Sequence, residues 1–135
     1  MAYGGAIDSA IDVWSEPFWD ACREGRLTAQ KCLTTGKFWF PPGPVSPFTR
    51  TPDWTWAGLS GRGRVKSFII MHQVYFTAFE DKVPYSIAQI ELEEGAMMLS
   101  NLVEIDNDDI RIGMSVEVTF EVRNGLNTPL FKPAN

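Results

Sequence analysis

Four large apolar side chains near the start of the chain recur at spacings of four, three and four residues, which places them on one face of a helix. They are Ile7, Ile11, Trp14 and Phe18. Pro17 interrupts this pattern, so the sequence predicts two short helices within residues 1–26. Ser15 is a candidate N-cap of the second helix, and Gly25 is typical of the position just after a helix end.

A strand pattern replaces the helical one after residue 26. The strand-like runs 27–33 and 37–40 flank Thr34-Thr35-Gly36, which predicts a hairpin with a glycine turn. Five prolines follow within residues 41–52. Because proline has no backbone N–H to donate, this stretch is predicted to be an irregular loop.

The remainder of the chain reads as a series of short strands. The clearest alternation runs from Val116 to Val122, with apolar residues at every second position, and predicts a strand with one buried face. Gly61-Arg62-Gly63 reads as a turn between two strands, and residues 105–113 read as a helical turn. The fold class is therefore mainly β, a small α+β protein that ends in a five-stranded OB-fold barrel. The predicted strands are residues 55–60, 65–79, 85–92, 96–103 and 116–122.

Composition narrows the function classes. The chain has 135 residues, and 12 Lys and Arg against 17 Asp and Glu give a net charge of −5. This balance argues against a protein that binds nucleic acid by neutralising phosphates. No apolar run is long enough to span a membrane, and the first residues lack the basic region of a signal peptide. With two cysteines, these features predict a cytoplasmic protein with free thiols.

Several motifs occur in an order that resembles a known family. EGRL, FPP, VPY followed by ELEEG, and a terminal LFKP together resemble the acyl-CoA-associated OB-fold family, long catalogued as a domain of unknown function. The resemblance covers nearly the whole chain. It implies N-terminal helices in residues 1–26, a rubredoxin-like zinc ribbon in 27–54 and an OB-fold in 55–135.

The resemblance does not extend to the zinc ligands of the ribbon. The family's ribbon carries two Cys-x-x-Cys pairs, whose four thiolates make a closed zinc site. The matching positions here are Cys32, Thr35, Ser46 and Thr49, so three of the four are hydroxyls. We therefore predict that zinc is absent, and pairing Cys22 with Cys32 cannot restore four ligands. An aromatic-rich segment takes the place of the metal: Phe38, Trp39, Phe40, Phe48, Trp54 and Trp56.

The resemblance also implies a function. Similar proteins are non-catalytic partners of thiolase-like enzymes (thiolases, acyltransferases of the polyketide type and steroid side-chain retro-aldolases), and some work beside MaoC-type enoyl-CoA hydratases. We expect an accessory subunit that docks on such an enzyme and helps to form its acyl-CoA site, with acyl-CoA as a shared ligand and no covalently bound cofactor. Family members often carry Arg after the double proline, where this chain has Gly43.

Two sets of residues are candidates for contacts, one with coenzyme A and the other with a partner protein. Arg62, Arg64 and Lys66 alternate with Gly63 and Val65, so they are expected to share a strand face that either binds phosphate or is an ordinary solvated edge. The full cationic set for coenzyme A is Lys37, Arg50, Arg62, Arg64 and Lys66. Aromatic residues near the N-terminus and in the ribbon either pack internally or anchor a partner. They are Trp14, Phe18, Trp19, Phe38, Trp39 and Phe40.

Two rival functions remain. OB-folds also bind single-stranded nucleic acid, and the aromatic content and the basic strand face favour that alternative. A stand-alone thioester enzyme would need a nucleophile beside a base. The only histidine, His72, is far in sequence from Cys22 and Cys32, so we predict structural thiols and no catalytic residue. His72 itself is expected to be a strand residue or part of a partner interface.

Overall fold

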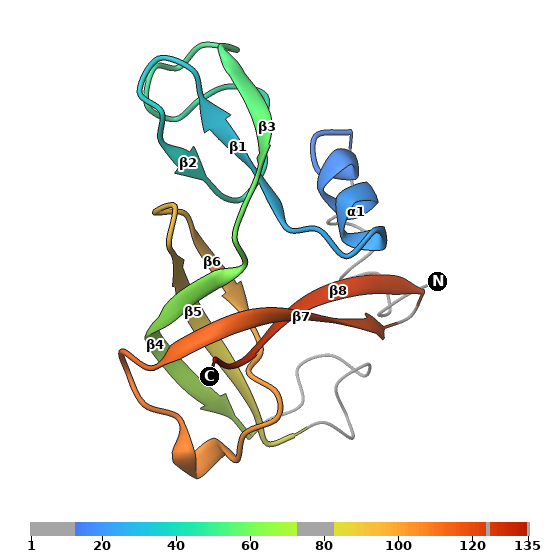
Figure 1. The fold of residues 1–135 in the computed structure, drawn as a ribbon, viewed down its shortest axis with the longest axis vertical. Coiled ribbons are helices and arrows are strands. Elements are labelled where there is room, and N and C mark those ends of the chain that lie inside the picture. Colours follow the sequence, from blue (N-terminus) through green and yellow to red (C-terminus); the bar gives the residue numbers. More distant parts are fainter. Residues whose placement is uncertain (1–12, 73–82, 124, 135) are drawn as a thin grey trace.

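The computed structural model describes residues 13–72, 83–123 and 125–134. One helix, a three-stranded ribbon sheet in the order β2-β1-β3 and a five-stranded sheet in the order β6-β5-β4-β7-β8 make up the fold (Figure 1). The first elements are α1 (Glu16–Arg23), β1 (Thr28–Cys32), β2 (Phe38–Trp39) and β3 (Trp54–Gly58). The barrel elements are β4 (Arg62–Met71), β5 (Tyr85–Leu92), β6 (Met97–Ser100), η4 (Asn107–Asp109), β7 (Ser115–Arg123) and β8 (Leu126–Pro133).

Helix α1 begins and ends where the sequence indicated. Pro17 lies in its first turn, where a missing N–H costs no helical hydrogen bond. Ser15 is the N-cap residue, but its side chain makes no capping hydrogen bond. At the other end Gly25 has φ +76° and donates its N–H to the carbonyl of Cys22, as in a Schellman motif. Most of the first predicted helix lies in residues 1–12, outside the described residues, and residues 13–15 form a turn that leads into α1.

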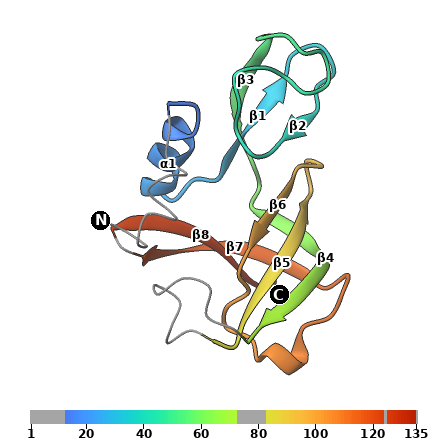
Figure 2. The ribbon, with the colours of Figure 1, turned by 180° about the vertical axis from the view of Figure 1, so that it is seen from behind.

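The ribbon sheet is built on the predicted hairpin. β1 pairs with β2 through Gln30 and Trp39, and with β3 through Cys32 and Trp54. The run 55–60, which the sequence suggested as a barrel strand, is therefore the third strand of the ribbon. Figure 2 shows β3 leaving the ribbon and leading directly into β4 of the barrel.

The barrel corrects three expectations. Its fifth strand is β8, which the sequence did not predict because the strand contains Pro129 and Pro133. β8 lies at the end of the sheet and pairs with β7. Proline is tolerated in such an end strand because one side of the strand has no ladder partner. Gly61-Arg62-Gly63 is not a turn, because β4 already begins at Arg62. Val122 is 68% exposed, so the buried face of β7 does not extend to its end.

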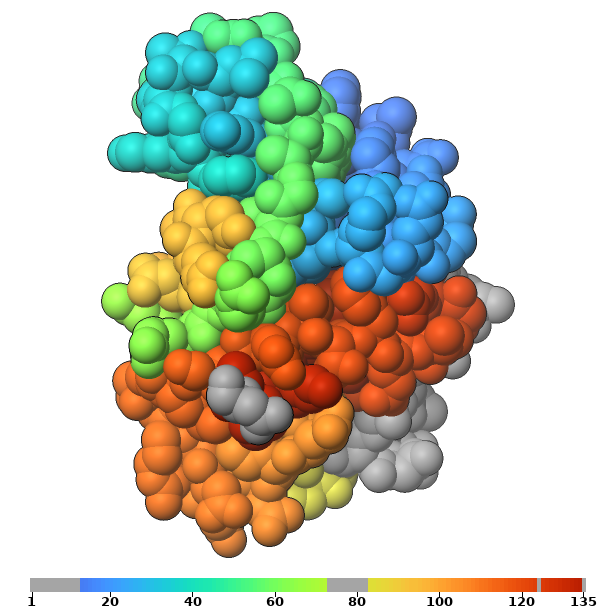
Figure 3. Space-filling model, viewed as in Figure 1, coloured from blue at the N-terminus to red at the C-terminus, as the bar shows by residue number. Residues whose placement is uncertain are grey.

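The hydrophobic core lies on the inner face of the curved five-stranded sheet. Ala88, Ile90 and Leu92 of β5 are buried, as their alternation predicted, and pack with Val116 and Phe131. Phe18 and Cys22 of α1 belong to the same core cluster, so the helix is attached to the barrel through its apolar face. Figure 3 shows the blue helical segment lying against the orange and red strands. Within the described ranges, no helix has the length and apolar character needed to span a membrane.

Candidate functional site

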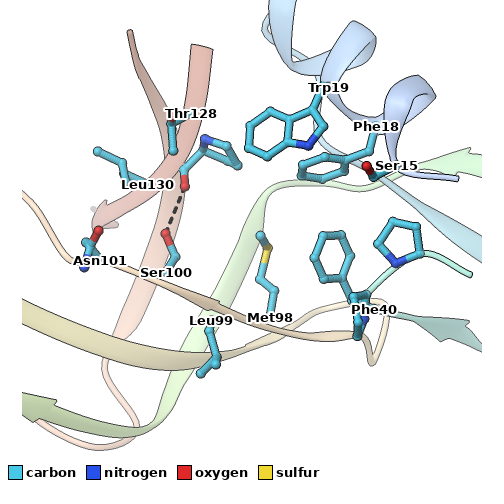
Figure 4. Close-up of a pocket in the computed structure, with 13 residues that line it drawn as sticks. Ser15, Phe18, Trp19, Phe40, Met98, Leu99, Ser100, Asn101, Thr128 and Leu130 are labelled. Atoms are coloured by element: carbon cyan, nitrogen blue, oxygen red, sulfur yellow. Dashed lines mark hydrogen bonds between the residues drawn. The ribbon is translucent and has the colours of Figure 1, made fainter. Parts of the chain in front are cut away.

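An apolar groove lies where α1, the end of the ribbon hairpin and the barrel meet (Figure 4). Its volume is about 280 Å³, and most of its wall is apolar. Trp19 comes from α1, Phe40 from the residue after β2, and Met98 and Leu130 from strands β6 and β8. The groove is therefore assembled from segments more than a hundred residues apart in the sequence.

The groove exists because the barrel does not close along its whole length. β6 and β8 are the two end strands of the five-stranded sheet. Just beyond β6, Leu102 forms an isolated parallel bridge with Phe131 of β8. At the end of β6, Ser100 Oγ donates to the carbonyl of Pro129 at 2.9 Å. The groove occupies the side of this closure toward α1, where Met98 faces Trp19 and Phe40 (Figure 4).

Three rings shape one end of the groove. Phe18 is 3% exposed and makes edge-to-face contacts with Trp19 at 5.1 Å and with Phe40 at 5.0 Å between ring centroids. Such contacts fix ring orientations through the aromatic quadrupole. Trp19 and Phe40 are only partly buried and line the groove, so Phe18 positions two rings whose surfaces remain available.

The apolar surface continues over the outer face of β6. A second pocket of about 390 Å³ shares Phe40, Met98 and Leu99 with the groove and extends to Met97. Leu99 is 70% exposed. An exposed apolar side chain of this size beside an apolar groove is typical of an interaction surface.

The predicted aromatic interface residues are thus divided. Trp19 and Phe40 line the groove, and Trp14 is 42% exposed just before α1. Phe18 and Trp39 are buried in internal packing, and Phe38 lies beneath the ammonium group of Lys31. Sequence reasoning missed Met98, Leu99 and Leu130 as groove residues, because strand alternation does not reveal which strands remain at the edge of a sheet.

Three of the four positions that match the family's zinc ligands lie together: Cys32, Thr35 and Ser46. The hydroxyls of Ser46 and Thr35 hydrogen-bond to Cys32 and lower the pKa of its thiol to about 7. Cys32 and Ser46 are both completely buried. The Thr49 hydroxyl is instead 2.8 Å from the hydroxyl of Thr51.

Among the described residues, Cys22 and His72 are the other groups that the sequence raised as reactive, and both lie on segments other than that of Cys32. Burial raises the pKa of the Cys22 thiol to about 12, which keeps it protonated at neutral pH. His72 is exposed directly after β4, whereas Cys22 lies in α1 and Cys32 at the end of β1. In the part of the chain that the structure describes, no group of three His, Cys, Asp or Glu side chains is placed to hold a metal ion.

The cationic candidates lie in two separate regions. Arg62 and Arg64 line a pocket of about 520 Å³ on the barrel, which is more polar than the groove and is called the polar pocket below. Arg62 Nε donates to Glu93 at 3.0 Å, which raises the pKa of Arg62 and lowers that of Glu93, and Arg64 donates to the carbonyl of Gly113 at 2.9 Å. A β-bulge between Val65 and Ser67 removes Lys66 from the expected alternation.

The remaining two cations belong to the ribbon. Lys37 Nζ lies 5.4 Å from the centre of the Phe48 ring. Arg50 has φ +59° in the loop between β2 and β3. Neither lines the polar pocket of the barrel, so the five cations do not form one patch.

Comparison with known proteins gives matches along most of the chain. Residues 19–45 match the family described as "ChsH2, rubredoxin-like zinc ribbon domain", and residues 56–121 match "ChsH2, C-terminal OB-fold domain". A DUF35 domain-containing scaffold protein of Methanothermobacter thermautotrophicus is 38% identical over 95 residues, which are 70% of this chain and 71% of that protein.

A longer relative and a solved structure extend these matches. A probable enoyl-CoA hydratase alpha subunit of Thermomonospora curvata is 39% identical over 119 residues, 87% of this chain but only 37% of that protein. The chain thus spans little more than a third of the hydratase subunit. A solved structure described as "Ltp2-ChsH2(DUF35) aldolase" has a TM-score of 0.83 and 35% identity, covering 93% of this chain and 98% of that chain.

Proposed function

The chain belongs to the DUF35 family of OB-fold proteins, and from this premise we propose that it is a non-catalytic accessory subunit of a thiolase-like enzyme. In this proposal the chain docks on the enzyme and helps to form its acyl-CoA site. The nucleophile and the base come from the partner.

The observation that carries the proposal is the apolar groove with its extension over β6. Trp19 and Phe40 present partly exposed rings there, and Leu99 is 70% exposed beside them. Aromatic side chains in preformed pockets are the usual anchors of protein interfaces. A groove of this kind provides a docking surface without requiring chemistry from this chain.

Two further observations support an accessory role. Both thiols are buried, and among the described residues no hydrogen bond joins the exposed His72 to either of them, so neither cysteine has the positioned base that a thiol nucleophile needs. Relatives of this chain are described as scaffold proteins, and one similar chain is part of an aldolase described as Ltp2-ChsH2(DUF35).

The finer parts of the proposal concern the ligand and a second partner. Acyl-CoA would be shared with the enzyme, and Arg62 and Arg64 are the proposed contacts for its phosphates because both line the polar pocket of the barrel. A MaoC-like hydratase is the proposed second partner, by analogy with relatives described as hydratase alpha subunits.

Nucleic-acid binding receives less support from the geometry. Trp54 makes edge contacts with Trp39 and with Trp56, whereas a platform that stacks bases needs exposed ring faces. Arg62 is already paired with Glu93, and the chain as a whole carries a net charge of −5.

Co-expression tests the proposal. The chain is produced together with the thiolase-like enzyme expected from a neighbouring gene, and the mixture is separated by size exclusion. We expect the two proteins to elute together, and thioester turnover to require both. Separate elution with full activity of the enzyme alone would contradict the proposal, as would turnover by this chain alone.

A further inference from the structure

The two turns at the tip of the ribbon share one backbone pattern. In the first turn the N–H of Cys32 donates to the carbonyl of Lys37 and the N–H of Gly36 donates to the carbonyl of Cys32, both at 2.8 Å. In the second turn Ser46 donates to Thr51 and Arg50 donates to Ser46, again both at 2.8 Å.

Backbone angles extend this correspondence. Gly36 has φ +75° and Arg50 has φ +59°, so both turns enter the left-handed region at the fifth residue. Cys32 therefore corresponds to Ser46, and Thr35 corresponds to Thr49. The first and fourth positions of each turn have the spacing of a Cys-x-x-Cys pair, and a structural zinc site takes its ligands from two such pairs.

The side chains on this frame do not fit zinc. Structural zinc sites use four ligands drawn from Cys thiolate, His nitrogen and carboxylate. The four positions here supply one thiol and three hydroxyls, from Cys32, Thr35, Ser46 and Thr49. No neighbouring His, Cys, Asp or Glu completes a set among the described residues.

The Cys32 sulfur is instead surrounded by hydrogen-bond donors. The hydroxyls of Ser46 and Thr35 and the backbone of Thr34 and Thr35 are its hydrogen-bonding neighbours, and together they lower the pKa of the thiol. The Ser46 hydroxyl also accepts the N–H of Phe48 at 3.2 Å, and the Thr35 hydroxyl accepts the N–H of Lys37 at 3.2 Å. We name Cys32, Thr35 and Ser46 the hydroxyl–thiol cluster. It joins the two turns, because Ser46 belongs to one turn and Cys32 to the other.

Aromatic rings reinforce the same region. Trp39 of β2 makes edge-to-face contacts with Phe48 in the second turn at 6.2 Å and with Trp54 of β3 at 6.4 Å. Trp54 in turn contacts Trp56 at 6.1 Å. The loop that carries Ser46 is thereby held to the sheet by packing as well as by hydrogen bonds.

We propose that this ribbon folds without zinc, with the hydroxyl–thiol cluster and the adjoining rings in the place of the metal, on a backbone that keeps the geometry of a zinc knuckle. This inference is independent of the proposed partner enzyme. It predicts that the ribbon is insensitive to chelators, and that cysteines at three positions are sufficient to restore a metal site.

The proposal that the ribbon folds without zinc is tested on the native protein. The full chain is expressed in zinc-supplemented medium, its zinc content is measured by elemental analysis, and its thermal unfolding is followed with and without EDTA. We expect far less than one zinc ion per chain and an unchanged Tm in EDTA. Near-stoichiometric zinc whose removal lowers the Tm would overturn the proposal.

The proposal that the backbone keeps the geometry of a zinc knuckle is tested by a variant that restores the missing cysteines. The triple variant Thr35→Cys/Ser46→Cys/Thr49→Cys should hold one zinc ion per chain and lose thermal stability in EDTA. Adding Cys32→Ser to the triple variant is the matched control and should weaken zinc binding. A triple variant that folds with no bound zinc would overturn the claim that the knuckle geometry is retained.

Discussion

The carboxamide of Gln30 forms two hydrogen bonds with the backbone of Gly43. Nε2 donates to the Gly43 carbonyl at 2.7 Å, and Oε1 accepts the Gly43 N–H at 2.8 Å. Gln30 is 1% exposed, so its polar group has no alternative partner in water. This pairing fixes the proline-rich loop to β1 just after Phe40 and Pro41, which line the groove.

Replacing Gln30 by Leu should destabilise the protein by about 1–3 kcal/mol, because it keeps the volume but leaves the Gly43 N–H and carbonyl without their partner. Chemical denaturation measures the effect. Gln89→Leu is the control, since Gln89 is only partly buried and its side chain makes a 3.4 Å contact with Ser67. Equal stability of the two variants would contradict this role of Gln30.

Gly63→Ala should cost about 1–3 kcal/mol through overpacking. A Cβ at Gly63 would lie 2.5 Å from the carbonyl oxygen of Glu91, which is backbone of the paired strand β5 and cannot rotate away. Gly58→Ala is the matched control, because nothing lies within 4 Å of its Cβ position. Thermal melts should separate the two variants; a Tm for Gly63→Ala as high as that of the control would show that β4 can shift to make room.

Leu99→Arg should abolish or strongly weaken co-elution with the partner enzyme while leaving the Tm of the isolated chain nearly unchanged. Leu99 is 70% exposed beside the groove, so a charge there is tolerated in water but not in an apolar interface. Ile112→Arg is the control, with 69% exposure and no part in the lining of the groove. Loss of binding in both variants, or in neither, would place the interface elsewhere.

Stability should fall as the pH rises above about 9, and part of this loss should be due to Cys22. Its ordinary thiol pKa of 9.0 applies to the unfolded chain, whereas burial raises the folded value to about 12. Between these values the unfolded chain releases a proton that the folded chain keeps, so rising pH favours unfolding. Cys22→Ala should therefore show a shallower decline between pH 9 and 12, by at most about 1.4 kcal/mol per pH unit.

Cys32 provides a comparison of opposite sign. Hydrogen bonds from Ser46 and Thr35 lower its pKa to about 7, below the unfolded value of 9.0. Its contribution to stability should therefore increase from pH 7 to pH 9, and Cys32→Ala should remove that increase. Parallel pH profiles for the wild type and both alanine variants would contradict the assigned environments of the two thiols.

Much of the secondary structure could be predicted because its signals are local. The glycine at 25 ended the helix, Thr34-Thr35-Gly36 closed the hairpin, and the alternation of Tyr85–Leu92 gave a strand whose buried residues were correctly identified. The order of short motifs along the chain was enough to indicate the family. Each turn, cap and strand signal depends on residues a few positions apart, and the motif order is read along the chain, so the sequence contains all of them directly.

The predictions that failed depended on strand neighbours. β3 was assigned to the barrel because its pattern does not say that β1 is its partner, and β8 was missed because Pro129 argues against a strand unless the strand lies at a sheet end. The alternation that grouped Lys66 with Arg62 was broken by a bulge opposite β5. Strand pairing is determined by contacts between residues far apart in the chain, and the alternation of apolar residues within one strand does not indicate its partner.

The sequence by itself determined most of the elements, the family and the replacement of three ribbon thiolates by hydroxyls, because these follow from residue identity and spacing. Only the tertiary structure decided that Ser46 and Thr35 would surround Cys32, and that Trp19, Phe40 and Met98 would meet at the opening between β6 and β8. The physical reason is that a groove or a cluster is a relation between distant segments. Burial of the common core brings those segments together, and no single segment specifies the groove or the cluster.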